Sequence, residues 1–285
     1  MVWVRLSPYH AGMNSSMTYP FHRPANAPFG EHLRAWRQRR RLSQLDLALE
    51  ADVSTRHLSF VETGRSEPSR EMVLRLAERL HIPLRERNTL LVAAGYAPMY
   101  HERPLDDPAL ASAKAAVELV LKAHEPYPAL ALDRHYHLVA ANRVVPLLLE
   151  GLPPDLLEPS PNVVRLSLHP RGMAPRIVNL RQWRSHILER LRQQITLTAD
   201  PALVALLEEV QAYPMAEQAQ ETTLDGEHLG VVMPLKLRSP VGVLSFISTL
   251  TVFGSPNDVT LQELAVESFF PADEATANTL RRLAG

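Results

Sequence analysis

Closely spaced helix caps constrain the fold of this chain more than any other feature, and they lie within residues 29–94. Apolar residues recur there with the period of an α-helix, but each run is short. Serines suited to an N-cap stand at positions 43, 54 and 69, and glycines suited to end a helix stand at 64 and 95. The pattern predicts five short helices, at about 29–40, 43–50, 54–63, 70–80 and 84–94.

The apolar stripes of the first three helices predict one shared core. The residues that we expect to be buried there are Leu33, Trp36, Leu45, Leu47, Ala48, Leu58 and Val61. Ala48 is small, which suits a close crossing of two helices, and Val53 is placed to fill the turn between them.

Charge is distributed unevenly along the chain. Residues 1–103 hold 15 basic and 10 acidic residues, a net charge of +5, and residues 104–285 have a net charge of −6, so that the whole chain reaches −1. Of the 30 basic residues 27 are arginine, the better partner for phosphate and guanine, although a G+C-rich genome produces the same bias. The basic part predicts an anionic partner.

One spacing pattern carries most of the functional information. It reads Leu42-Ser43-Gln44-x-x-Leu47-Ala48-x-x-Ala51-x-Val53-Ser54-x-x-x-Leu58-x-x-x-Glu62-x-Gly64-Arg65-x-x-Pro68. This string resembles the helix-turn-helix of the phage-repressor (XRE/Cro) type. The resemblance implies that the third helix is a recognition helix, which lies in the major groove of double-stranded DNA.

The same resemblance implies which residues face the DNA. They are Ser43, Gln44, Ser54, Thr55, Arg56, Ser59, Phe60, Thr63 and Arg65. Arg56 is able to make a bidentate contact to guanine, whereas Arg65 matches a position that lies along the phosphates. Arg37 and Glu62 match a buried salt bridge of the family. The basic run 39–41 suits either a phosphate-facing patch or a solvated helix end.

The flanking residues are less informative. Residues 1–28 lack a helical or strand period, so we expect a loose tail or packing across a dimer partner. Residues 96–106 form a proline-bearing linker. No long apolar run and no secretory signal is present, which predicts a cytoplasmic chain without membrane contact.

Residues 107–285 follow a different pattern. Two strand-like runs, at 129–133 and 136–141, precede helices at 142–149, 180–197 and 201–212, and strand-like runs return at 229–237, 241–253 and 259–269. The economical arrangement is a five-stranded antiparallel sheet with the helices inserted after its second strand. The fold class is therefore α+β, with an all-α unit at 29–95 and a sheet-containing domain at 107–285.

This second domain resembles the ligand-binding domain of MmyB-like regulators. The resemblance rests on the following residues: Pro128-x-Leu130-x-Leu132-Asp133, Leu138-x-x-Ala141-Asn142, Asn162-Val163-Val164-Arg165-Leu166, Trp183 and Arg238-Ser239-Pro240-Val241-Gly242. The resemblance implies a PAS-like fold with a small molecule between the sheet and its helices. Arg238 departs from the pattern, which more often has histidine there.

Apolar residues at a pocket-facing period either line such a site or fill a core. The candidates are Leu132, Leu138, Trp183, Ile187, Leu191, Val232, Leu235, Phe246, Ile247 and Val252. The few aromatic residues disfavour a flavin or haem and favour an apolar or amphiphilic guest such as a fatty acid. The arginines between residues 165 and 192 are able to supply a cation to its carboxylate.

Catalysis has little support in the sequence. The motifs of hydrolases, zinc proteases, P-loop and dinucleotide-binding enzymes are missing, and without cysteine there is no thiolate chemistry. Asp133, His135 and His137 have the composition of a metal site, but a hairpin turn with exposed histidines explains them as well. We expect no enzyme activity, no cofactor and no metal.

Taken together, the sequence predicts a homodimeric transcription regulator that binds a double-stranded DNA operator and a small apolar ligand. The alternative is a regulator or adaptor whose C-terminal domain only dimerises or binds a protein partner.

Overall fold

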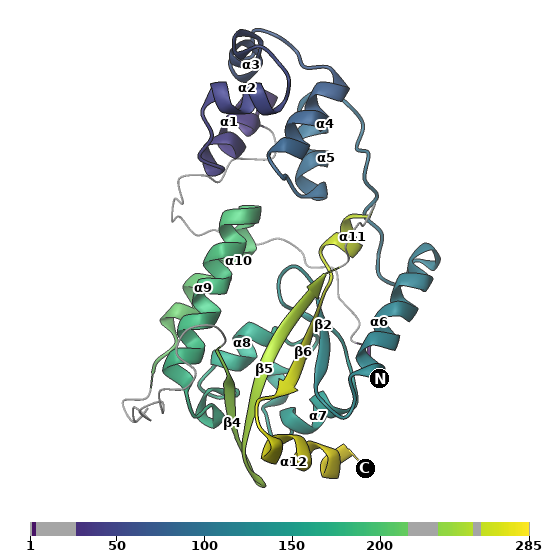
Figure 1. Ribbon diagram of the computed structural model, residues 1–285, viewed down its shortest axis with the longest axis vertical. Coiled ribbons are helices and arrows are strands. Elements are labelled where there is room, and N and C mark those ends of the chain that lie inside the picture. Colours follow the sequence, from purple (N-terminus) through teal and green to yellow (C-terminus); the bar gives the residue numbers. More distant parts are fainter. Residues whose placement is uncertain (1, 4–26, 216–232, 253–257, 285) are drawn as a thin grey trace.

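Five short helices form the N-terminal unit of the computed structural model, which describes residues 2–3, 27–215, 233–252 and 258–284 (Figure 1). The helices are α1 (Phe29–Arg39), α2 (Gln44–Glu50), α3 (Thr55–Glu62), α4 (Arg70–Arg79) and α5 (Leu84–Ala93). All five predicted helices are present, and their ends lie within two residues of the predicted positions.

Side-chain caps explain these boundaries. The Ser43 hydroxyl accepts from the Asp46 N–H at 3.1 Å, and the Asp46 carboxylate accepts from the Ser43 N–H at 2.9 Å, a reciprocal capping box. The Ser54 and Ser69 hydroxyls cap α3 and α4 by accepting from the His57 and Met72 N–H groups, without a reciprocal bond. Gly64 follows α3 with φ of +72°, a conformation that favours glycine.

The core of the N-terminal unit differs from the prediction at one position. Leu47, Ala48, Leu58 and Val61 are buried, but Leu45 is 55% exposed. Two residues along a helix are about 200° apart, so Leu45 and Leu47 cannot both face the core. The prediction that Leu45 is buried was wrong.

The C-terminal domain is built on a six-stranded antiparallel sheet with the order β1-β3-β2-β6-β5-β4. The strands are β1 (Val2–Trp3), β2 (Ala129–Leu132), β3 (Leu138–Ala141), β4 (Leu235–Ser239), β5 (Gly242–Val252) and β6 (Ala265–Pro271). Five of these strands come from residues 107–285, which confirms the predicted sheet. The sixth, β1, pairs with β3, so Val2–Trp3 are part of the sheet, whereas residues 4–26 lie outside the described residues.

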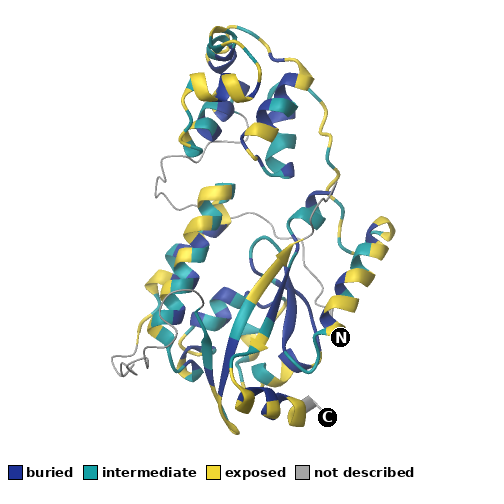
Figure 2. Cartoon of the chain, in the orientation of Figure 1, coloured by how far each residue is buried: buried dark blue, intermediate teal, exposed yellow. Residues whose placement is uncertain are grey.

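Helices cover both faces of this sheet. They are α6 (Ala111–Ala123), α7 (Val144–Leu149), α8 (Val163–Leu168), α9 (Leu180–Thr198), α10 (Pro201–Ala212), α11 (Val259–Gln262) and α12 (Glu274–Ala284). On one face, Val117 and Leu121 of α6 pack on Ala129 and Ala131 of β2. The other face carries α7 to α10 and the larger core, so that the whole of β2 and the middle of β6, Val266 to Ser268, are buried (Figure 2).

The last third of the chain departs from the predicted strands. Residues 259–262 form α11 and β6 begins only at Ala265, so the predicted strand at 259–269 is wrong in its first part. The Asp258 carboxylate accepts from the Thr260 N–H and starts the helical turn. The strand predicted at 229–237 begins at Leu235, and its residues 229–232 lie outside the described residues.

The two units meet at α5 and α11. The Arg85 guanidinium donates to Glu263 and to Glu102, and the Leu84 N–H donates to the Gln262 amide oxygen at 2.7 Å. Arg103 of the linker forms an ion pair with Asp258 at 2.7 Å. These contacts tie the N-terminal unit to one end of the sheet. Among the described residues, no helix is long and apolar enough to cross a membrane.

Candidate functional site

Helix α3 presents a mixed polar and aromatic surface outward. Leu58 and Val61 are buried and seat the helix on the core, which leaves Arg56 exposed and Thr55, Ser59 and Phe60 partly exposed. The Arg56 guanidinium carbon lies 5.4 Å from the centre of the Phe60 ring. This stacking supports the guanidinium from one side while its N–H donors remain on the outer surface.

The other residues predicted to face DNA lie around this helix, with different roles. Ser43 and Ser54 accept hydrogen bonds as caps, which leaves each hydroxyl hydrogen for a phosphate oxygen. The Thr63 hydroxyl instead donates to the Ser59 carbonyl oxygen at 2.8 Å, so its donor serves the helix end. Arg65 is exposed directly after α3, where a cation suits a DNA backbone.

Gln44 is held on the inner side of this surface by the buried Glu62. Its amide nitrogen donates to Glu62 Oε2 at 2.7 Å, and Arg37 donates to both carboxylate oxygens of Glu62 at 2.6 and 2.9 Å. Burial alone would raise the pKa of Glu62, but the hydrogen bonds from Arg37 and Gln44 outweigh it and lower that pKa. The Glu62 carboxylate therefore joins α1, α2 and α3.

Two residues of the basic run 39–41, Arg39 and Arg40, point away from the α3 surface. Arg39 and Arg40 lie over the Trp36 ring, at 4.4 and 5.3 Å from its centre. The Arg40 guanidinium donates to the carbonyl oxygens of Leu80 and His81 after α4, and to that of Leu197 in α9. Arg40 therefore contributes to the junction between the two units and not to the α3 surface.

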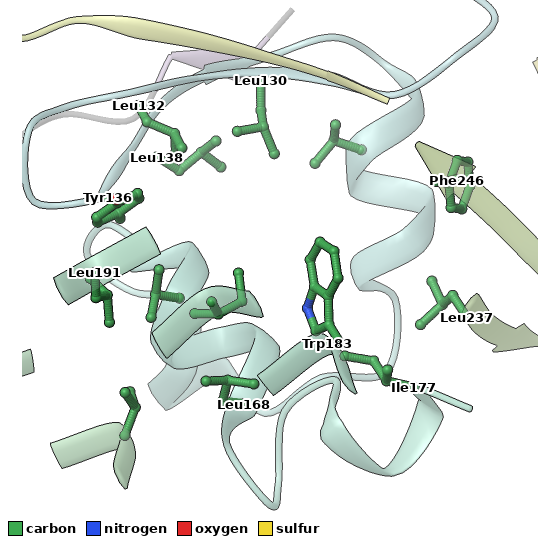
Figure 3. Close-up of a cluster of buried hydrophobic side chains, with 14 of the residues drawn as sticks. Leu130, Leu132, Tyr136, Leu138, Leu168, Ile177, Trp183, Leu191, Leu237 and Phe246 are labelled. Atoms are coloured by element: carbon green, nitrogen blue, oxygen red, sulfur yellow. The ribbon is translucent and has the colours of Figure 1, made fainter. Parts of the chain in front are cut away.

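An apolar cavity of about 100 Å³ lies between the sheet and α7, α8 and α9. In Figure 3 the Trp183 indole of α9 points toward the side of the cavity that carries Leu130 and Leu138. The Trp183 indole N–H donates to the Ser167 hydroxyl at 2.9 Å, so the polar atom of the ring is satisfied beside the cavity. The remaining wall is almost entirely apolar.

Half of the predicted pocket residues line this cavity. Leu138, Trp183, Ile187, Leu235 and Phe246 do so, whereas Leu132 and Leu191 are buried in the adjoining core. Ile247 is not among the lining residues because it points to the opposite face of β5 from Phe246. Val252 is 59% exposed at the end of β5, beyond the cover of the helices. Val232 lies outside the described residues.

Sequence reasoning missed much of the wall that α7 and α8 supply. The missed lining residues include Leu130, Val145, Leu148, Leu149, Val163, Val164, Leu166, Met173, Leu237 and Phe269. A signal for α8 was present: Asn162 precedes an apolar run, and its side chain accepts from the Arg165 N–H at 3.1 Å as an N-cap.

One ion pair interrupts the apolar wall. Arg190 of α9 and Glu267 of β6 both line the cavity, with Arg190 Nη1 2.9 Å from Glu267 Oε1. The Arg190 guanidinium carbon also lies 5.1 Å from the centre of the Tyr136 ring. Burial alone would lower the pKa of Arg190, but the charge and hydrogen bond of Glu267, together with the interactions of Tyr136, outweigh it and raise that pKa. The cavity therefore has a permanently charged cation at its wall.

The Asp133, His135 and His137 side chains are brought together at the turn between β2 and β3, with potential ligand atoms within 4.8 Å of one another. The histidines are partly buried, not exposed as expected. Asp133 Oδ1 accepts from the backbone N–H groups of both histidines at 2.8 Å. His135 Nε2 lies 2.8 Å from Asp200 Oδ2. These contacts close the turn and attach it to the start of α10.

A polar cleft of about 530 Å³ separates the two units beside this turn. Its wall includes Trp36 and Arg39 of α1, Glu86 of α5, Arg134 and Asp200. Burial raises the pKa of Glu86; the charge of Arg134 opposes this rise, and the charge of Asp200 adds to it. Burial between the two units therefore disfavours the ionised form of the Glu86 carboxyl group.

Comparison with known proteins assigns families to both units. Residues 113–283 match the MmyB-like transcription regulator ligand binding domain, and residues 33–87 match a helix-turn-helix family. The HTH-type transcriptional repressor RghR of Bacillus subtilis (strain 168) is 40% identical over 75 residues. That match covers 26% of this chain and 53% of the relative, so the similarity spans about half of the relative's length.

Proposed function

The chain belongs to the family of MmyB-like transcription regulators, and we propose that it binds a two-fold operator as a homodimer under the control of an apolar, fatty-acid-like ligand. It is a DNA-binding regulator. The observation that carries the operator proposal is Arg56, exposed on α3 and stacked on Phe60 in a basic unit. A single helix-turn-helix covers little DNA, which is why a dimer on two half-sites is expected.

The wall of the cavity supports the ligand class. It is apolar apart from a few polar groups, and among these Arg190 is the cation suited to a carboxylate. A volume of about 100 Å³ holds only a small apolar group, since an engineered cavity of ~150 Å³ takes up benzene. A longer acyl chain therefore either extends out of this space or displaces α7, α8 or α9 from the sheet.

A displacement of α9 would be felt in the DNA-binding unit through hydrogen bonds and ion pairs at the end of this helix. The Leu197 carbonyl oxygen near the end of α9 accepts from Arg40, and Asp200 after α9 lies 3.6 Å from Arg134, which also contacts Glu263. Glu263 in turn binds Arg85 of α5. A ligand that displaces α9 would change these contacts, and it shifts the regulator only if it binds one arrangement more tightly than the other.

We place the protein in the cytoplasm, where an operator is accessible, and we propose that it has no catalytic activity. Support for the second point is that the described His and Asp cluster at 133–137 is engaged in closing a turn. The alternative function, a regulator whose C-terminal domain only dimerises or binds another protein, predicts no response to any apolar ligand.

Selection of bound fragments from genomic DNA, with and without added long-chain fatty acid, tests the proposal. We expect a two-fold site to be enriched by the wild-type chain and its occupancy to change with the acid. Enrichment that is unaffected by the acid would favour the alternative, and failure to enrich any site would contradict operator binding.

A further inference from the structure

The turn between β2 and β3 brings one carboxylate and two imidazoles together. Asp133, His135 and His137 each have a potential ligand atom within 4.8 Å of those of the other two, and no second group of this kind occurs in the part of the chain that the structure describes. Their side chains are 25%, 24% and 19% exposed. The sequence alone is explained as well by a turn with exposed histidines, but polar side chains buried to this extent need polar partners or an ion.

The two oxygens of Asp133 have different tasks. Oδ1 accepts from the backbone N–H groups of His135 and His137, both at 2.8 Å, and so closes the turn. Oδ2 lies 3.1 Å from Nδ1 of His137. A tetrahedral ion with bonds of ~2.0 Å holds two ligand atoms about 3.3 Å apart, so Oδ2 and Nδ1 are already close to that separation. Backbone hydrogen bonds to the other oxygen are the support that a ligating carboxylate ordinarily has.

Asp200 holds the second imidazole from a distant part of the chain. Its Oδ2 lies 2.8 Å from Nε2 of His135, and its Oδ1 caps α10 by accepting from the Ala202 N–H at 2.9 Å. The Asp200 side chain is only 12% exposed. A histidine that binds a metal ordinarily donates its other ring N–H to a carboxylate or carbonyl oxygen, which fixes the orientation of the ring. Asp200 therefore orients His135 and leaves Nδ1 for an ion.

We propose that Asp133, His135 and His137 bind a Zn²⁺ ion, with Asp200 as a positioning residue. Imidazole nitrogens and a carboxylate oxygen are ligands that Zn²⁺ accepts, whereas Mg²⁺ and Ca²⁺ take oxygen ligands. The chain has no cysteine, so a zinc site in it consists of histidine and carboxylate groups. Three protein ligands are one fewer than in a structural zinc site, which suits an ion that the protein gains and loses with its supply.

The proposed site lies at the junction between the two units. His135 and Asp200 line the polar cleft, and Arg134 of the same turn lies 3.6 Å from Asp200 and 3.4 Å from Glu263. Glu263 in turn binds Arg85 of α5 in the DNA-binding unit. An ion that fixes the turn therefore also holds the C-terminal side of this junction in place.

The same turn reaches the apolar cavity through Tyr136. Its side chain is part of the larger core, where Figure 3 shows it with Leu138 and Leu191. The Tyr136 ring centre lies 5.1 Å from the guanidinium carbon of Arg190, which lines the cavity. The three proposed zinc ligands do not line that cavity, so the ion occupies a separate site. The turn thus connects both sites with the junction, and the ion is a second effector of the regulator.

Isothermal titration calorimetry of the full-length, chelator-treated chain with zinc chloride tests the site. We expect one ion per chain in the wild type and a loss of affinity of at least about tenfold in Asp133→Asn. This variant keeps Oδ1 as the acceptor that closes the turn and replaces the ligating Oδ2 by an amide nitrogen. Asp155→Asn is the matched control, because it makes the same change at a side chain that is 57% exposed and outside the cluster. A wild type that does not bind zinc, or equal affinities of the wild type and Asp133→Asn, would overturn the proposal.

Asp200→Asn tests the positioning residue. Asparagine caps a helix as well as aspartate does, so the melting temperature of the metal-free chain should be unchanged. The charge-assisted contact with His135 is lost, and we expect the affinity for zinc to fall by about 10- to 100-fold. Unchanged affinity would contradict the role of Asp200, and a lower melting temperature without zinc would show that Asp200 acts on the fold instead.

Thermal unfolding provides a second readout that needs neither DNA nor lipid. Zinc should raise the melting temperature of the wild type and of Asp155→Asn but not that of Asp133→Asn, because an ion bound to the folded chain stabilises it. The same rise in all three proteins, or an equal rise with Mg²⁺, would overturn the zinc site. Since no operator and no fatty acid is present, that outcome would leave the operator and ligand proposals intact.

Discussion

Arg37 of α1 holds the carboxylate of Glu62 of α3 in a two-point contact, with Nε 2.6 Å from Oε1 and Nη2 2.9 Å from Oε2. The Glu62 side chain has no exposed surface, and Gln44 of α2 donates to the same carboxylate. The contact therefore fixes the recognition helix against both preceding helices. Removing either member leaves an ionised or polar group buried.

We expect Arg37→Ala to destabilise the N-terminal unit by about 3–5 kcal/mol, because Glu62 is left buried with weaker partners. Urea unfolding followed by circular dichroism measures the effect. Arg171→Ala is the control, since it breaks an Arg–Asp contact with Asp155 of similar geometry but with both side chains more than half exposed. That variant should lose far less stability, because an exposed ion pair is screened by solvent. Equal losses in the two variants would contradict the structural role of Arg37.

Glu86 is expected to behave in the opposite way to Glu62. Burial raises the pKa of Glu86 in the folded chain, so the ionised form at neutral pH reduces stability. Glu86→Gln should therefore raise the melting temperature at about pH 8, and the gain should shrink as the pH falls through the raised pKa and the native carboxyl becomes protonated. A gain that grows on acidification, or a loss at pH 8, would show that the Arg134 and Arg85 charges outweigh burial.

Arg56 and Arg65 should have separable effects on DNA binding. Arg56→Ala is expected to cost about 1–3 kcal/mol and to relax the preference at one base position, because a bidentate contact to guanine carries sequence information. Arg65→Ala should weaken the affinity for every DNA sequence alike. It should also lower the slope of log affinity against log salt concentration by about one, because one phosphate contact is lost. Competition binding to the selected site and to random DNA at several salt concentrations measures both. Identical profiles for the two variants would argue against a base contact by Arg56.

Local sequence signals were sufficient for most of the N-terminal unit. Caps at Ser43, Ser54 and Ser69 depend on neighbouring residues, and the Arg37–Glu62 pair follows from a shared spacing pattern. Leu45 was misplaced because an apolar residue was counted without its angle around the helix. Gln44 was expected beside the DNA, and its bond to Glu62 depends on a contact across 18 residues that composition does not reveal.

The cavity depended on non-local packing and was only half predicted. Leu138, Trp183, Ile187, Leu235 and Phe246 carry a period that points inward. Val252 follows the same alternation along β5, but the strand extends past the helices, so the period continues where burial ends. Similarly, α11 replaces a strand-like run because Asp258 caps it and the linker residue His101 accepts from the Val259 N–H.

The cavity itself allows a test of the ligand class. Ile187→Phe adds volume at the wall of a space of only about 100 Å³, so we expect at least a tenfold loss of fatty-acid affinity with DNA binding retained. Isothermal titration calorimetry with a long-chain acid measures the loss. Val243→Phe, at an exposed position on β5, should leave the affinity unchanged.

The charge of the bound headgroup is tested at Glu267. Glu267 already neutralises Arg190, so a ligand carboxylate at Arg190 must approach two opposite charges at once. Glu267→Gln removes the like charge and keeps an acceptor for Arg190, which should raise the affinity for the acid about tenfold, equivalent to ~1.4 kcal/mol. The alcohol of the same chain length has no charge to repel and should bind both proteins equally. If Glu267→Gln changes acid and alcohol affinity alike, the headgroup does not reach Arg190 and the cavity binds only the apolar chain.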